Sequence, residues 1–112
     1  MSEIKDLNEY QELSKRTMPA HDDKGKANYA LGFVGESAEV GDLIKKEVFH
    51  GHPVDVDSVK KELGDSFHYL AGLATMYGLT LQEIAEANIE KLRKRYPSGF
   101  SVEDSIKRVD TK

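Results

Sequence analysis

Apolar residues are spaced helically along almost the whole chain. Near the N-terminus they recur at every third position, at Ile4, Leu7, Tyr10 and Leu13. Ser2 can cap this helix, which we expect to run to about Arg16. Pro19 and Gly25 interrupt the pattern, so a loop should follow.

A second helix is predicted over about residues 26–48. One of its faces carries Phe33, Glu36, Val40 and Leu43. Gly51 and Pro53 should end this helix. Asp57 or Ser58 can cap a third helix, and Gly78 is its expected stop. The third helix has an apolar stripe made of Val59, Leu63, Phe67, Leu70, Ala74 and Tyr77.

Thr80 and Glu83 have the spacing of a capping box, which predicts a fourth helix from there to about Arg95. Pro97 and Gly99 break it, and a short amphipathic turn is expected over residues 102–109. No segment has the pattern of a strand. We therefore predict an all-α fold in which four main helices pack as a four-helix bundle. Without internal repeats or shifts in composition, residues 1–112 are expected to form one domain.

The length of the chain limits its core. A domain of 112 residues buries only about 65% of the surface that its unfolded chain exposes. A second copy could cover more apolar area, so the chain is expected to associate with itself.

Charge and cysteine content narrow the function classes. Sixteen basic and twenty acidic residues give a net charge of −4, which argues against general affinity for nucleic acids. The absence of cysteine excludes disulfides, thiolate chemistry and cysteine-bound metals. No segment resembles a signal peptide or a membrane span, so we expect a cytoplasmic protein without a membrane partner.

Polar residues interrupt the apolar stripes at three places. On the second helix Glu36 lies inside the stripe and Glu39 follows three residues later. On the third helix Glu62 and Asp65 have the same spacing and border the stripe. On the fourth helix Asn88 and Arg95 interrupt the apolar stripe, and Lys91 lies three residues after Asn88. Because an unpaired buried carboxylate is costly, these interruptions require an explanation.

Two explanations are open. Carboxylates three residues apart are common on solvated helix faces, and the acidic pairs could be such a face. Alternatively, four carboxylates from neighbouring helices converge to bind Mg²⁺, which prefers oxygen ligands and completes its shell with water and substrate phosphates. Asn88, Lys91 and Arg95 on the fourth helix would then face an anionic ligand. Two pairs on consecutive helices favour this second interpretation.

The spacing of these acidic residues is similar to a known signature. Glu36-Ser37-Ala38-Glu39, followed after 22 residues by Glu62-Leu63-Gly64-Asp65, resembles the E-x-x-E and E-x-x-D motifs of MazG-like nucleoside triphosphate pyrophosphohydrolases. The flanking segments 31–35, 60–61 and 88–96 are also similar. The resemblance covers about residues 27–100.

This resemblance implies an enzyme that uses Mg²⁺, or Mn²⁺ in its place, to hydrolyse a (deoxy)nucleoside triphosphate to the monophosphate and pyrophosphate. It implies that Glu36, Glu39, Glu62 and Asp65 are catalytic metal ligands. The residues implied to contact the substrate are Asn88, Lys91, Arg95, Tyr69 and Tyr96. Relatives assemble as dimers or tetramers with the active site near the subunit interface. Some relatives use tryptophan to hold the base, but this chain has none.

Two other functions fit parts of the sequence. Glu47-Val48-Phe49-His50 matches the Glu-x-x-His half-motif of di-iron bundles, although such sites need two of these motifs. A helical nucleotide-binding or protein-interaction module with a solvated acidic face would be non-enzymatic. Bound iron would indicate the first, and the absence of Mg²⁺-dependent triphosphate binding the second.

Overall fold

The computed structural model describes residues 3–111, and its elements are helical. In chain order they are α1 (Leu7–Ser14), the 3₁₀ turn η1 (Lys15–Thr17), α2 (Asp23–His50), α3 (Val56–Met76), α4 (Leu81–Arg95), α5 (Val102–Lys107) and η2 (Val109–Thr111). The predicted all-α fold is confirmed. Ser2, the expected first cap, lies outside the described residues.

Side-chain oxygens determine where the helices begin. Asp6 caps α1 by accepting the Glu9 backbone N–H, so α1 starts later than the apolar spacing predicted. Asp22 caps α2 in the same way. The prediction that Asp57 or Ser58 caps α3 was wrong, because Asp55 accepts both the Asp57 N–H and the Ser58 hydroxyl.

The capping box at α4 is confirmed, because the Thr80 and Glu83 side chains each accept the other residue's backbone N–H. Glycines lie at two helix ends, as predicted. Gly51 follows α2 with φ 69°, and Gly78 follows α3 with φ 71°. Only glycine adopts this left-handed conformation without strain, so the chain turns sharply at both places.

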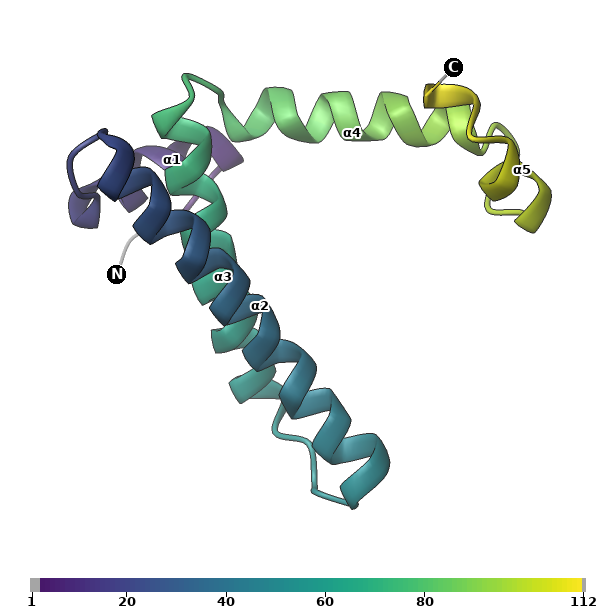
Figure 1. Cartoon of the computed structure of the whole chain (residues 1–112), viewed down its shortest axis with the longest axis horizontal. Helices are drawn as coiled ribbons and strands as arrows, with labels where there is room; N and C mark the ends of the chain where they lie inside the picture. Colours follow the sequence, from purple (N-terminus) through teal and green to yellow (C-terminus); the bar gives the residue numbers. More distant parts are fainter. Residues whose placement is uncertain (1–2, 112) are drawn as a thin grey trace.

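The helices form two arms rather than a closed bundle within one chain. α2 and α3 lie side by side as a long hairpin, and α1 packs against α3 and the start of α4. α4 then projects away from the hairpin and carries α5 and η2 at its far end (Figure 1). The four-helix arrangement that the periodicity suggested is therefore open. Among residues 3–111, α4 contacts α1 at its start and α5 and η2 near its end.

A buried glutamine fixes the junction of α1, α3 and α4. The Gln11 amide donates to the Thr75 hydroxyl and to the Leu79 carbonyl, each at 2.9 Å. Its oxygen accepts the Leu81 backbone N–H at 2.8 Å. The apolar stripe predicted for α1 placed Leu7 and Leu13 inward, but both are exposed. The helix is thus anchored by hydrogen bonds from a face that the apolar pattern did not identify.

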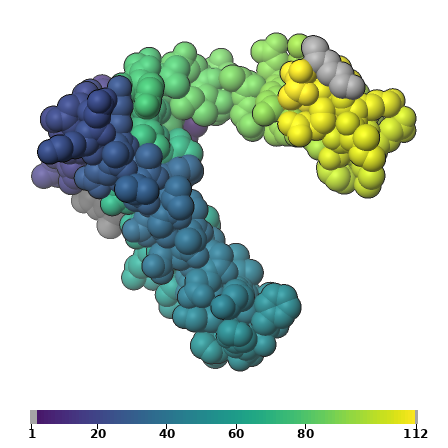
Figure 2. Space-filling model, viewed as in Figure 1, coloured from purple at the N-terminus to yellow at the C-terminus, as the bar shows by residue number. Residues whose placement is uncertain are grey.

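The core of the chain is small. Its buried hydrophobic residues are Tyr29, Ala71, Ala74 and Leu81. Many large apolar side chains stay exposed on both arms, including Leu31 at 72% and Ile106 at 76%. Figure 2 shows the two arms separated by an open angle. Among the described residues, no helix is both long and apolar enough to cross a membrane.

Candidate active site

Two glycine–tyrosine contacts set the register of the α2–α3 hairpin. A Cβ at Gly72 would collide with the Tyr29 ring, and a Cβ at Gly32 would collide with the Tyr69 ring. Each helix therefore contributes one glycine and one tyrosine, and each ring lies over the backbone of the other helix. The two rings also contact each other edge to face at 4.9 Å between centroids. Close contacts of this kind permit only one register.

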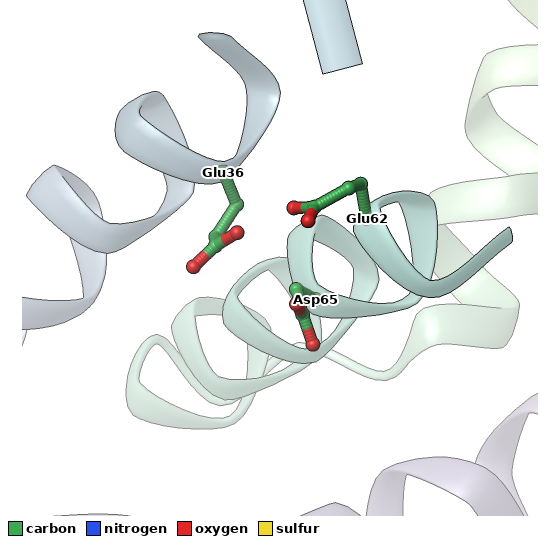
Figure 3. A group of neighbouring side chains, drawn as sticks. All are labelled: Glu36, Glu62 and Asp65. Atoms are coloured by element: carbon green, nitrogen blue, oxygen red, sulfur yellow. The ribbon is translucent and has the colours of Figure 1, made fainter. Parts of the chain in front are cut away.

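This register brings the acidic residues together. Glu36 follows Gly32 by one turn of α2, and Asp65 precedes Tyr69 by one turn of α3. In the antiparallel hairpin these two positions face each other. Carboxylate oxygens of Glu36, Glu62 and Asp65 lie within 4.8 Å of one another. Figure 3 shows Glu36 on one helix reaching toward Glu62 and Asp65 on the other.

The three carboxylates repel one another. The pKa of Glu36 is raised, first by partial desolvation and then by the neighbouring Asp65 and Glu62 carboxylates. None of the ion pairs among residues 3–111 involves the three carboxylates. The cluster therefore concentrates negative charge without a protein cation to balance it.

Glu39, the fourth predicted ligand, lies outside this cluster. It is exposed on α2, three residues after Glu36, so it is on the same side of the helix. Its charge is one of the causes of the raised Glu36 pKa, which shows that the two carboxylates are near each other.

Tyr10 of α1 packs on α3 two residues beyond Asp65, and the sequence analysis did not identify it as a site residue. Its ring stacks on Phe67 of α3 with 4.6 Å between centroids. Burial and the charge of Asp65 raise the pKa of its hydroxyl. In the sequence, Tyr10 looked like a packing residue because it belongs to an apolar stripe. Only the contact between α1 and α3 shows that it lies near Asp65.

The predicted substrate residues are not assembled with the carboxylates in one chain. Asn88 and Lys91 are exposed on α4, which projects away from the hairpin (Figure 1). Arg95, at the end of α4, pairs with Asp110 of η2 through Nε at 2.6 Å and Nη2 at 2.8 Å. Tyr96 lies beside this guanidinium, 5.9 Å from ring centroid to Cζ. Tyr69 is nearer the cluster but packs against Gly32.

The histidines do not extend the cluster. His50 and Glu47, the half-motif of a di-iron site, lie near the C-terminal end of α2, with His50 about 21 Å along the helix from Glu36. The His68 ring is near the hydroxyls of Thr17 and Tyr29, each at 3.3 Å from Nε2. It helps to join η1 to the hairpin.

A cluster of this composition is suited to a hard divalent cation. Each of the three carboxylates can offer one oxygen, and the set contains no nitrogen or sulfur. A cation would also relieve the repulsion that raises the pKa of Glu36. Asp65 is exposed and Glu36 and Glu62 are half-buried, so water and a ligand of the cation can reach the site.

The chain was compared with protein families and known proteins. A family model described as the MazG nucleotide pyrophosphohydrolase domain matches residues 24–100, which include all four predicted metal ligands. A relative, the gene 37 protein of Mycobacterium phage L5, is 30% identical over 80 residues, which are 68% of this chain and 70% of the phage protein. No solved structure matches the chain. The chain belongs to the MazG nucleotide pyrophosphohydrolase family.

Proposed function

We propose that this protein is a Mg²⁺-dependent enzyme that hydrolyses a (deoxy)nucleoside triphosphate to the monophosphate and pyrophosphate. The observation that carries the proposal is the convergence of Glu36, Glu62 and Asp65 on two helices that are locked in register. Family membership supports the class of reaction. We place the enzyme in the cytoplasm, without a nucleic-acid or membrane partner.

Glu36, Glu62 and Asp65 would hold the cation, and Glu39 would join them by a change of its side-chain rotamer. The bound cation, Mg²⁺ or Mn²⁺, would neutralise phosphate charge and stabilise the developing negative charge of the leaving pyrophosphate. A carboxylate oxygen not used for binding the cation would accept the proton of the attacking water. Tyr69, held against Gly32, would line the site beside these carboxylates.

The site needs cations beyond the metal, because a triphosphate carries more negative charge than one divalent ion balances. In this chain the candidate phosphate contacts Asn88, Lys91 and Arg95 lie on the separate α4 arm. We propose that a homodimer or homotetramer brings α4 of one copy to the carboxylates of another. The exposed apolar residues Ile89 and Leu92 on α4 support this arrangement, because an uncovered apolar stripe favours association.

A panel of canonical and modified nucleoside triphosphates tests the proposed reaction. With Mg²⁺ present, we expect pyrophosphate release from at least one of them, and Asp65→Asn should reduce it by at least about 100-fold. Glu47→Gln is the matched control, because Glu47 is a carboxylate of α2 outside the cluster and should leave the rate unchanged.

Failure to release pyrophosphate from any nucleotide would refute the proposed reaction. Full activity of Asp65→Asn would remove Asp65 from the site. Iron that copurifies with the protein, together with the absorption band of an oxo bridge, would instead favour the di-iron alternative. Triphosphate binding that does not change when Mg²⁺ is removed would favour a binding module.

A further inference from the structure

The ion pair between Arg95 and Asp110 joins the end of α4 to the C-terminal turn η2. Both Asp110 oxygens accept a hydrogen bond, one from Nε at 2.6 Å and the other from Nη2 at 2.8 Å. The Asp110 side chain is 1% exposed and that of Arg95 is 15% exposed. This pair is bidentate and almost fully desolvated. The other ion pairs of residues 3–111 join exposed side chains three or four residues apart.

A left-handed residue, Arg108, turns the backbone so that the Asp110 carboxylate reaches α4. Arg108 has φ 50° and ψ 51°, the left-handed conformation that residues with a Cβ rarely adopt. It ends α5 and turns the chain back, so that η2 packs against α4. Strain of this kind persists only where other contacts hold it in place. The Arg95–Asp110 pair is one such contact, and hydrogen bonds from Thr111 to the Arg108 carbonyl are others.

The geometry of the pair leaves part of the guanidinium outside it. Nε and Nη2 form the edge that contacts Asp110, whereas Nη1 lies outside this edge. A substrate phosphate does not displace Asp110 from Arg95, because breaking a buried pair leaves an uncompensated charge. A phosphate oxygen would therefore meet Arg95 at its remaining donors, with the ion pair intact.

We propose that Asp110 is a positioning residue that holds the Arg95 guanidinium so that its free donors bind a phosphate of the substrate. This proposal rests on the proposed function, because Arg95 is a phosphate contact only if the substrate is a nucleoside triphosphate. The contact with Asp110 restricts the rotamers of the long Arg95 side chain. An arginine that is already ordered loses less conformational entropy when it binds a phosphate. Lys91, whose charge also acts on Asp110, lies on the same part of α4.

Calorimetric binding of inorganic triphosphate in the presence of Mg²⁺ tests this role without requiring turnover. We expect Asp110→Asn to weaken binding about 10-fold, as is typical when a residue that orients a ligand-binding group is lost. Arg95→Lys should weaken binding as well. If Asp110 acts through Arg95, the double variant should bind no more than about twofold less tightly than Arg95→Lys alone.

The matched control is Glu103→Gln, which removes the carboxylate of an exposed ion pair in the same C-terminal segment and should not change the affinity. Asp110→Glu, which keeps the charge, should recover part of the affinity lost in Asp110→Asn. Unchanged affinity of Asp110→Asn, or the same fractional loss with and without Arg95→Lys, would overturn the proposal. Wild-type protein that does not bind triphosphate would also overturn it, whereas absent turnover with normal binding would refute only the proposed reaction.

Discussion

The Glu36 carboxylate lies against those of Glu62 and Asp65, and its pKa is raised. Its raised pKa means that the folded chain holds a proton on Glu36 more tightly than the unfolded chain does. The contribution of Glu36 to stability is therefore present below the ordinary glutamate pKa of about 4.3 and is lost as the pH rises through the raised value. At neutral pH the ionised carboxylate is a destabilising group until a cation binds.

We therefore predict that Glu36→Gln raises the melting temperature of the metal-free protein at pH 7. The same change should abolish most of the stabilisation that Mg²⁺ gives the wild type, because a ligand of the cation has been removed. Thermal melts with EDTA and with Mg²⁺ measure both effects, with Glu47→Gln as control. A variant that is less stable than the wild type in EDTA, or equally stabilised by Mg²⁺, would contradict this account of Glu36.

At the level of helices, the α2–α3 register depends on Gly32 and Gly72, which leave room for a tyrosine ring of the other helix. Gly72→Ala places a methyl group against the Tyr29 ring, so we expect it to destabilise the protein by about 1–3 kcal/mol. Because the contact also aligns the carboxylates, activity should fall with it. Chemical denaturation and the pyrophosphate assay measure the two effects.

Gly35→Ala is the comparison, since nothing lies within 4 Å of a Cβ at that helical position. It should stabilise the protein by up to about 1 kcal/mol, as expected when alanine replaces glycine inside a helix. If both substitutions change stability equally, the glycine–tyrosine contacts do not set the register.

The α1–α3–α4 junction depends on Gln11. Replacing it with leucine would leave the Leu79 carbonyl and the Leu81 N–H without their partner in a buried place. We predict a loss of at least about 2 kcal/mol in the free energy of unfolding. Asn8→Ala, which removes a longer and exposed contact to Gln82, should cost much less. Equal losses for the two variants would show that Gln11 is not the anchor of the junction.

These elements differ in how far the sequence could predict them. Helix starts with a local cap, such as Thr80 with Glu83, follow from spacing alone because the interaction is between neighbours. Gln11 was missed because its partners are more than 60 residues away, and a polar residue off the apolar stripe gives no signal of burial. Asp110 was missed for the same reason, since nothing near it in the sequence indicates a contact with Arg95.

The carboxylate cluster was predicted in part. Helical spacing predicted that Glu36, Glu39, Glu62 and Asp65 converge, and the hairpin brings all of them except Glu39 within 4.8 Å of one another. The direction of α4 could not be derived from its amphipathic pattern, because the same stripe can pack within the chain or against another copy. The position of Asn88 and Lys91 relative to the carboxylates therefore depends on the assembly.

For the whole molecule, the open arms and the small core predict that the chain associates. We expect sedimentation equilibrium to give a dimer or tetramer at micromolar concentration. Ile89→Asp should shift it toward the monomer and reduce activity at least about 10-fold, because a charge on the exposed stripe of α4 must be desolvated in any interface. Ala87→Asp introduces the same charge at an exposed position on the opposite side of α4 and is the control. A wild-type monomer with full activity would contradict the proposed sharing of the site.

The measurement that tests the central claim most directly is ³¹P nuclear magnetic resonance of a nucleoside triphosphate incubated with the protein and Mg²⁺. The account predicts signals of the monophosphate and pyrophosphate, absent with EDTA and absent with Asp65→Asn. Formation of the diphosphate and inorganic phosphate instead, or pyrophosphate formation that is unaffected by Asp65→Asn, would contradict it.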